Sequence, residues 1–337
     1  MKLSIVSLLN ESERDTRSFL KDLSEQTNQD FEIILVFAKN KNFKSTFAAI
    51  KEFTDFFGSR MRLVINYKRQ SYQYDILSAF RVVKGDYTTV IYPNSPLKKD
   101  TVKILIQNAK QYDADILEFT PRLVGSIRWK PESRLQMDEP INAQTNPEVL
   151  AYSYPFIFNK VFKSKLVKPI YKLELLDAID NSLAIEINYK LLLHAETYMY
   201  LSENIKKEYF EVDTWLNVQG LVSTFERVEQ LFAYSNRKIK HEFEYLKNQF
   251  FLVVLPGLIG STSYRNLNTL IHIKEMREKR GEKNISKIEN YIKKIRENEA
   301  FQVFCESNIY MQNDTNMTKL IRYETPTDKW ASLLKGI

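Results

Sequence analysis

Short apolar runs alternate with amphipathic segments along the first 120 residues of the chain. The apolar runs predict strands at residues 3–8, 31–37, 62–67, 87–92 and 115–119. The segments between them predict helices that follow residues 10–13 and that span residues 45–57, 72–83 and 99–111. This rhythm favours an α/β fold with a mostly parallel sheet and helices on both of its faces.

The remainder of the chain changes character twice. Residues 121–150 contain four prolines and a glycine and predict an irregular excursion, after which residues 155–210 return to ordered structure. Beyond residue 213 the pattern is almost entirely helical, with Pro256-Gly257 and Gly281 as predicted breaks between helices. We therefore predict an α/β domain at 1–212 and a helical C-terminal region at 213–337.

The amino-acid composition limits the classes of protein to which this chain can belong. Of the 337 residues, 44% are hydrophobic and 27% are charged, which is enough to bury a sizeable core. The single cysteine, Cys305, excludes an internal disulfide framework and a cysteine-based zinc site, and it fits a reducing compartment. The N-terminus lacks the features of a signal peptide, and no apolar run reaches the roughly 20 residues that span a bilayer. A cytoplasmic location is the expectation.

The net charge of +7 is concentrated in one place. Residues 274–296 hold 9 Lys and Arg against 4 Glu, and the rest of the chain is nearly neutral. This window, with its stripe of isoleucines, predicts either a helix packed on the protein, which we favour, or a basic surface that touches an anionic membrane. A nucleic-acid partner is disfavoured, because no basic stripe with aromatic residues and no known binding module is present.

Several segments resemble, in order, family 2 glycosyltransferases of the GT-A fold, over roughly residues 1 to 210. The first strand with its Asn-Glu loop and the "QT…DFEIILV" stretch carry much of the resemblance. The matching segments are residues 3–11, 19–27, 30–36, 84–87 (KGDY), 96–101, 112–116, 159–163 (NKVFK) and 189–195. The resemblance implies a GT-A-like domain with a nucleotide-sugar site at the carboxyl ends of the strands.

The family normally places acids at three positions, and this chain departs from each. The residues after the second strand are Phe37-Ala38-Lys39-Asn40, where an aspartate normally bonds the nucleotide base. The metal-binding DxD position contains Tyr92-Pro93-Asn94-Ser95, and Ala184 stands in place of the usual catalytic base. The family's "ARNxG" turn is replaced by the segment that starts at Asp75. The DxD and base motifs are thus degenerate, and we expect no divalent metal.

The resemblance and the strand ends together give a set of candidate residues. Candidates for binding a UDP-sugar or a similar donor are Ser7, Asn10, Glu11, Ala38, Lys39, Tyr92 and Asn94. For Tyr92 and Asn94 the alternative, which we favour slightly, is a filled and collapsed pocket, and Asn10 and Glu11 equally fit the start of a helix. Glu186 is the candidate catalytic base, with a solvated carboxylate at a helix start as the alternative.

Two functions remain open. The first is metal-independent sugar transfer from a nucleotide sugar to a glycan or glycolipid acceptor of the cell envelope, with the enzyme cytoplasmic and peripheral on the inner membrane face. The second is a non-catalytic homologue, a pseudoenzyme that serves as a scaffold or regulator of a protein partner such as an active transferase.

Overall fold

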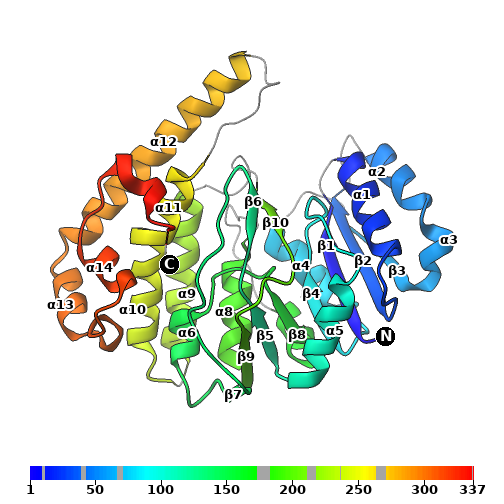
Figure 1. The fold of residues 1–337 in the computed structure, drawn as a ribbon, viewed down its shortest axis with the longest axis horizontal. Helices are drawn as coiled ribbons and strands as arrows, with labels where there is room; N and C mark the ends of the chain where they lie inside the picture. Colours follow the sequence, from blue (N-terminus) through cyan, green and yellow to red (C-terminus); the bar gives the residue numbers. More distant parts are fainter. Residues whose placement is uncertain are drawn as a thin grey trace. The chain divides into compact units, whose positions relative to one another are not determined.

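The computed structural model describes residues 1–9, 12–38, 43–66, 71–172, 183–210, 218–235, 237–262, 271–335 and 337. For residues 38, 43, 171–172 and 271–281 it describes the backbone alone. The chain forms two compact units (Figure 1). The first comprises Met1–Arg122, Leu135–Asn146 and Tyr154–Tyr209, and the second comprises Leu123–Arg134, Pro147–Ser153 and Phe210–Ile337. The predicted boundary at residue 212 lies outside the described residues and stays a prediction.

The first unit is built on an eight-stranded sheet with the order β3-β2-β1-β4-β8-β5-β9-β7. Its strands are β1 (Leu3–Leu8), β2 (Phe31–Ala38), β3 (Met61–Asn66), β4 (Tyr87–Val90), β5 (Ile116–Phe119), β7 (Ile141–Asn142), β8 (Lys160–Lys163) and β9 (Thr197–Leu201). The run β3-β2-β1-β4 is parallel, as is the pair β5-β9, whereas β8 is antiparallel to both β4 and β5. The predicted α/β class with a mostly parallel sheet is confirmed.

The central strands form where the sequence is apolar on both faces. All six residues of β1 are buried, and so are the side chains of β2 from Phe31 to Phe37. Parallel strands covered by helices on both faces need such continuous apolar runs. The matching helical stripes, Phe19, Leu20 and Leu23 on one helix and Val102, Leu105 and Ile106 on another, belong to the same apolar core.

The first unit has helices α1 (Glu13–Ser24), α2 (Phe43–Lys51), α3 (Thr54–Phe57), α4 (Tyr72–Phe80), α5 (Thr101–Tyr112), α7 (Ser164–Val167) and α8 (Ile185–His194), and the 3-10 turns η1 (Gly58–Arg60) and η2 (Lys168–Lys172). The prediction of one continuous helix over 45–57 is wrong. The N–H of Phe53 bonds to the carbonyl of Ile50, three residues back, at 3.0 Å, and this tighter turn separates α2 from α3.

The second unit is mainly helical, so the predicted helical C-terminal region is confirmed. It contains β6 (Leu123–Gly125), α6 (Glu148–Tyr152), α9 (Val218–Tyr234), α10 (Lys240–Gln249), the π-helix η4 (Phe250–Val254), α11 (Leu255–Gly260), α12 (Ile271–Arg296), α13 (Glu299–Ser307), α14 (Asn316–Arg322) and the 3-10 turns η5 (Ile309–Met311) and η6 (Thr327–Ser332). The chain passes from the first unit to the second within β10 (Glu208–Phe210), where Ser126 donates to the carbonyl of Phe210 at 3.1 Å.

The predicted helix breaks in this unit are wrong. The chain is helical through Pro256-Gly257, because the π-helical turn of η4 joins α10 to α11 just before a proline that has no N–H to donate. Gly281 lies inside α12. Ile288 and Ile292 of α12 are buried, as the packed-helix interpretation of the isoleucine stripe requires. Within the described ranges, no helix combines the length and the apolar character needed to cross a membrane.

Candidate functional site

The carboxyl ends of β1, β2, β3 and β4 meet at one edge of the sheet because these strands are parallel, and ligands of open α/β sheets bind at such an edge. Ser7, the predicted binding residue of β1, is fully buried near this end. Its hydroxyl has no hydrogen-bond partner in the described part of the chain. A buried, unsatisfied hydroxyl costs on the order of 1–3 kcal/mol. A polar ligand atom that bonded to Ser7 would remove this cost.

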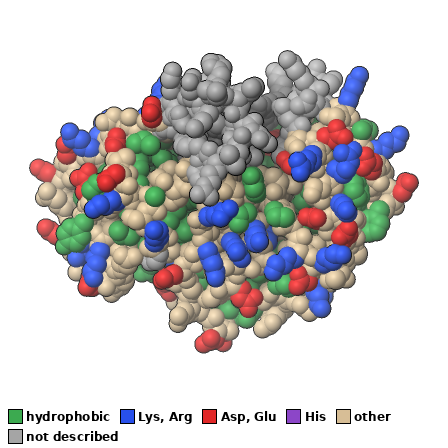
Figure 2. Space-filling model, turned by 45° about the horizontal axis from the view of Figure 1, so that its top comes forward, with side chains coloured by type: hydrophobic (Ala, Val, Ile, Leu, Met, Phe, Trp, Pro, Cys, Tyr) green, Lys and Arg blue, Asp and Glu red, His purple; other side chains and the backbone are tan. Residues whose placement is uncertain are grey.

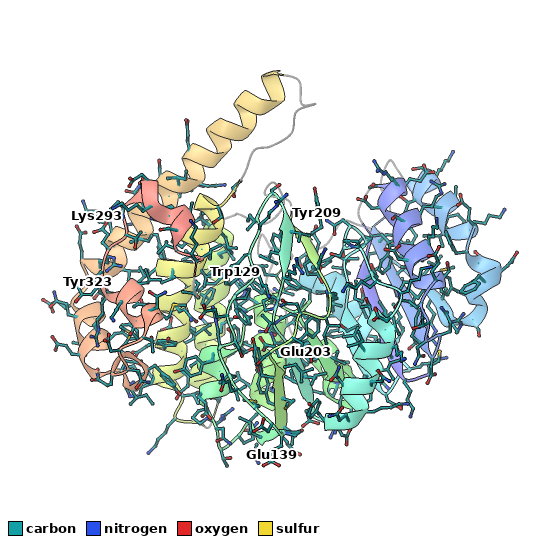
Figure 3. The ribbon with its side chains drawn as sticks, in the orientation of Figure 1. Trp129, Glu139, Glu203, Tyr209, Lys293 and Tyr323 are labelled. Carbon is teal, nitrogen blue, oxygen red and sulfur yellow. The ribbon has the colours of Figure 1, made fainter. Side chains whose placement is uncertain are left out.

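The segment that follows β4 carries the predicted residues Tyr92 and Asn94. Tyr92 is 9% exposed and meets the ring of Phe158 edge-on, with 6.1 Å between the ring centroids. The amide of Asn94 donates to the carbonyl of Tyr209 at 3.3 Å. Tyr209 lies on β10, as labelled in Figure 3. The strand-end segment is therefore held by the chain that leaves β9.

A buried ion pair lies beside this segment, and sequence reasoning missed it. The ammonium of Lys206 contacts the carboxylate of Glu208, and both side chains are almost fully shielded from solvent. The other carboxylate oxygen of Glu208 accepts a hydrogen bond from the Ser95 hydroxyl at 2.6 Å. Burial lowers the pKa of Lys206 well below its usual value. The nearby carboxylate of Glu208 opposes this effect, because a negative charge favours the charged form of a lysine.

These residues do not fit a divalent cation. Mg²⁺ and Mn²⁺ prefer carboxylate and other hard oxygen ligands, whereas the strand end offers the Tyr92 phenol, a proline and the Asn94 amide. The neighbouring Glu208 is already paired with Lys206. Across the described ranges, no group of three or more His, Cys, Asp and Glu side chains is placed to hold a metal ion.

Glu186, the candidate catalytic base, lies in the first turn of α8 and is 4% exposed. It is therefore not the solvated helix-start carboxylate that was the alternative. Ala184, which the sequence resemblance aligns with the family's base, precedes α8 in a left-handed conformation with φ of 49° and is fully buried. The side-chain oxygen of Gln73 on α4 accepts a hydrogen bond from the N–H of Ile187 at 3.2 Å. This bond connects α4 to the first turn of α8.

A second missed residue, Asp75, lies at the same edge of the sheet. Asn66, the last residue of β3, donates its side-chain amide to the carboxylate of Asp75 in the first turn of α4. Burial raises the pKa of Asp75 from 3.8 to about 6, and the hydrogen bond from Asn66 opposes this rise. In the sequence Asp75 was visible only as a departure from the family's turn. A raised carboxyl pKa at a ligand-binding edge is a mark of functional sites.

The other predicted binding residues cannot be placed in the same way. Asn10, Glu11 and Lys39 lie outside the described residues. Ala38 is the last residue of β2, and only its backbone is described. The structure thus brings Ser7, Tyr92 and Asn94 to the carboxyl edge of the sheet and leaves their role as donor-binding residues a prediction.

The family-like Asn159-Lys160 element has a structural role. The Lys160 ammonium is fully buried and donates to the carbonyls of Tyr154 and Phe156 at 2.7 and 2.8 Å, and it pairs with Glu118 at 3.2 Å. The amide of Asn159 donates to the carbonyl of Phe119 at 2.9 Å. These bonds help to hold β8 in its place between β4 and β5.

The fold is shared with proteins solved in complex with nucleotide sugars. S. aureus TarS (residues 1–349) superposes with a TM-score of 0.58 at 14% identity, over 77% of this chain and 80% of TarS. The same protein in complex with UDP-GlcNAc gives 0.58 at 13% identity, over 79% and 82%. The mannosyltransferase PcManGT from Pyrobaculum calidifontis, in complex with GDP-Man and Mn²⁺, gives 0.54 at 10% identity, over 99% and 84%.

Comparisons of sequence alone give no such relationship. No protein-family model matches this chain, and no curated protein sequence matches it. At 10 to 14% identity the structural similarity establishes the fold and leaves the chemistry to be argued from the residues. It confirms the fold that the GT-A resemblance implied.

Proposed function

We propose that this protein is a glycosyltransferase of family 2 type that binds a nucleotide-sugar donor without a divalent cation. The observation that carries the proposal is the set of polar side chains at the carboxyl edge of the parallel run β3-β2-β1-β4. Ser7 comes from β1, Asn66 and Asp75 from β3 and α4, and Asn94 from the end of β4. Two structural neighbours, TarS and PcManGT, are complexes with UDP-GlcNAc and GDP-Man.

Each of these groups suits a part of a nucleotide sugar. The carboxylate of Asp75 is an acceptor for a ring N–H such as those of uracil and guanine. The unsatisfied hydroxyl of Ser7 and the amide of Asn94 can bond to sugar or phosphate oxygens. Lys and Arg side chains are also exposed on the face drawn in Figure 2, and cationic side chains attract anionic ligands.

Calorimetric titration tests the donor. UDP, UDP-GlcNAc, GDP and GDP-Man would each be titrated into the full chain in EDTA and again in Mn²⁺. We expect one class of nucleotide to bind with an affinity that EDTA does not change. Asn94→Ala should weaken this binding, whereas Asn108→Ala, which removes a half-buried amide within α5, should leave it unchanged. Absence of binding by every nucleotide, or binding that requires Mn²⁺, would contradict the proposal.

The acceptor that we propose is a glycan or glycolipid of the cell envelope, reached at the inner membrane face. The described part of α12 turns Ile288 and Ile292 inward and leaves Lys287, Lys293 and Lys294 exposed. This face can attract anionic lipid by charge, although its apolar stripe is not free to insert. Sedimentation with anionic vesicles should show binding at low salt that is lost at high salt, since screening weakens such attraction. No binding at low salt would remove the membrane from the proposal.

The second candidate is a non-catalytic homologue that binds a nucleotide or a protein partner. The observation that favours it is the pair of residues at the base position, since Ala184 has no carboxylate and Glu186 is buried. A general base must come within about 3 Å of the oxygen whose proton it removes. The two candidates differ in turnover, so release of free sugar from the nucleotide sugar that binds would be followed over hours. Turnover that Glu186→Gln abolishes supports the transferase, and binding without turnover supports the non-catalytic protein.

A further inference from the structure

Lys206 is a buried lysine near the end of β4. The absence of the metal-binding motif at this strand end suggests why a lysine lies here. Its ammonium lies 5.6 Å from the ring centroid of Phe158 and 6.0 Å from that of Phe119. Phe158 also meets Tyr92, the residue at the first DxD position, edge-on. The ammonium and Tyr92 therefore contact the same aromatic ring. Cations over aromatic faces are attracted by the ring electrons, which favours a charged group at this depth.

Glu208, the partner of Lys206, is hydrogen-bonded to Ser95, which directly follows the DxD position. Glu208 contacts the ammonium with one carboxylate oxygen and accepts the hydroxyl of Ser95 with the other. The N–H of Tyr209 donates to the same hydroxyl at 3.2 Å. Asn94, beside Ser95, is held by the carbonyl of Tyr209. The ion pair is thus bound to the segment 92–95 by side chains on both sides.

A buried ion pair is expensive, because both charges lose their hydration. A carboxylate such as Glu208 beside oxygen donors is also the kind of group that collects a divalent cation. Here the charge of Glu208 is already balanced by an ammonium that is part of the chain. Tyr92 stands at the first position of the DxD motif in place of an aspartate. Asn94, at the third position, offers an amide in place of the second aspartate.

We infer that Lys206 is a built-in cation that takes the place of a divalent metal ion at the end of β4. This inference rests on the proposed function for its purpose, since the donor of such an enzyme carries a diphosphate whose charge a metal ion normally balances. Its central claim concerns metal binding alone. Glu208 holds Lys206 and therefore binds no metal, and removal of the lysine charge frees Glu208 to act as a metal ligand.

Mn²⁺ titrations followed by electron paramagnetic resonance test this claim on the full chain without nucleotide. The wild type should show no Mn²⁺ site that depends on Glu208. The double variant Asn94→Asp with Lys206→Met supplies two free carboxylates beside Ser95, and we expect it to bind one Mn²⁺ at least about tenfold more tightly than the wild type. The matched control combines Asn94→Asp with Lys207→Met, which removes an exposed neighbouring charge and should bind no more tightly than the wild type.

Two results would overturn the inference. One is equal Mn²⁺ affinity in the double variant and in its Lys207 control, provided that both retain the far-UV circular dichroism of the wild type. The other result is a Mn²⁺ site in the wild type that Glu208→Gln abolishes, because it would show that Glu208 already binds metal. This result does not depend on whether a Lys206 variant folds. The Mn²⁺ titrations contain no nucleotide, so their result can be interpreted even if the protein binds no nucleotide sugar. The nucleotide titrations can likewise be interpreted if the Mn²⁺ result contradicts the role of Lys206.

Discussion

Ser4 of β1 donates its hydroxyl to the carboxylate of Glu32, its register partner on β2, at 2.6 Å in the fully buried centre of the sheet. The same carboxylate oxygen accepts the N–H groups of Lys84 and Gly85 at 2.5 and 3.1 Å. Arg62 of β3 pairs with the other oxygen at 2.9 Å. One carboxylate thus links β1, β2, β3 and the loop that leads into β4.

Replacement of Glu32 by Gln should therefore destabilise the first unit. Gln keeps the shape but removes the charge that strengthens the bonds from Ser4 and the Lys84-Gly85 loop, so we expect the free energy of unfolding to fall by about 1.5–3 kcal/mol. The described tryptophans, Trp129 and Trp330, belong to the second unit, so hydrogen exchange of peptides from β1 and β2 is the suitable measurement.

Glu139→Gln provides the matched control for this change. Glu139 is an exposed glutamate of the same unit, labelled in Figure 3, and its loss of charge should leave exchange of β1 and β2 unchanged within about 0.5 kcal/mol. Equal exchange in both variants would show that the buried carboxylate is dispensable.

The family-like motifs of this chain are mostly structural. A Cβ at Gly85 of the KGDY segment would lie 2.8 Å from the backbone of Leu3 and Ser4, so only glycine allows this close approach. Gln26 of the "QT" pair bonds to the carbonyl of Lys98 at 2.8 Å and accepts the N–H of Val102 at 3.0 Å. These residues fix the sheet and its helices. They therefore maintain the fold.

Lys160→Met tests the structural role of the Asn159-Lys160 element. The change leaves the carboxylate of Glu118 and two buried carbonyls without the ammonium, and removal of one partner of a buried ion pair typically costs about 3–5 kcal/mol. Thermal unfolding followed by far-UV circular dichroism should show a large loss for the first unit. Lys165→Met, at an exposed lysine that pairs with Asp115, should have a small effect. A mild effect of Lys160→Met would contradict the structural role of this lysine.

Most of the fold could be predicted from the sequence, because its central strands are marked by local pattern. Residues 3–8 and 31–37 are apolar on both faces, which is what a buried parallel strand requires. The position of β8 between β4 and β5 could not be predicted in this way. Its sequence, Lys160–Lys163, begins and ends with lysine, and its place depends on the buried bonds of Lys160.

The candidate site was less predictable for a similar reason. The segment Asn204–Glu208 contains two lysines and a glutamate and has the pattern of a solvated loop. Lys206 and Glu208 are buried only because Phe119, Phe158 and Ser95 come to them from other parts of the first unit. Local sequence carries no signal for such pairing. The strand-end rule, in contrast, placed Ser7, Tyr92 and Asn94 at the carboxyl edge of the sheet, where the structure also has them, and their role in binding stays a prediction.

Gly260→Ala should destabilise the second unit. A Cβ at this position of α11 would lie 2.6 Å from the backbone nitrogen of Ala331 and from the Cβ of Trp330, so the segment η6 would have to move. We expect a loss of about 1–3 kcal/mol, as for other overpacked sites. Trp330 is buried at this contact, and its fluorescence during urea unfolding reports the change. Ser332→Ala, at an exposed position of η6, is the control, and an equal unfolding midpoint in the two variants would contradict the contact.

The half-buried Asp75 gives a prediction with a definite pH dependence. Its pKa is raised from 3.8 to about 6, so the folded chain holds this proton more tightly than the unfolded chain does. The contribution of Asp75 to stability is therefore fully present below about pH 4 and is lost as the pH rises through about 6. Asp75→Asn cannot ionise, and it keeps the oxygen that accepts from Asn66. It should match the wild type near pH 4 and exceed its stability above pH 6.

Above pH 6, Asp75→Asn should raise the free energy of unfolding by an amount on the order of 1 kcal/mol. The gain is small because the Asp75 side chain is partly exposed, so solvent screens part of the cost of its charge. Hydrogen exchange of peptides from β3 and α4, measured at several pH values and corrected for intrinsic rates, checks this. Asp100→Asn, at an exposed aspartate before α5, should show no such pH-dependent gain. A gain of equal size at pH 4 and pH 7 would contradict the cause that we assign. A carboxylate that costs stability at neutral pH is explained if it binds a ligand, so the same variant should also weaken the nucleotide binding proposed above at pH 7.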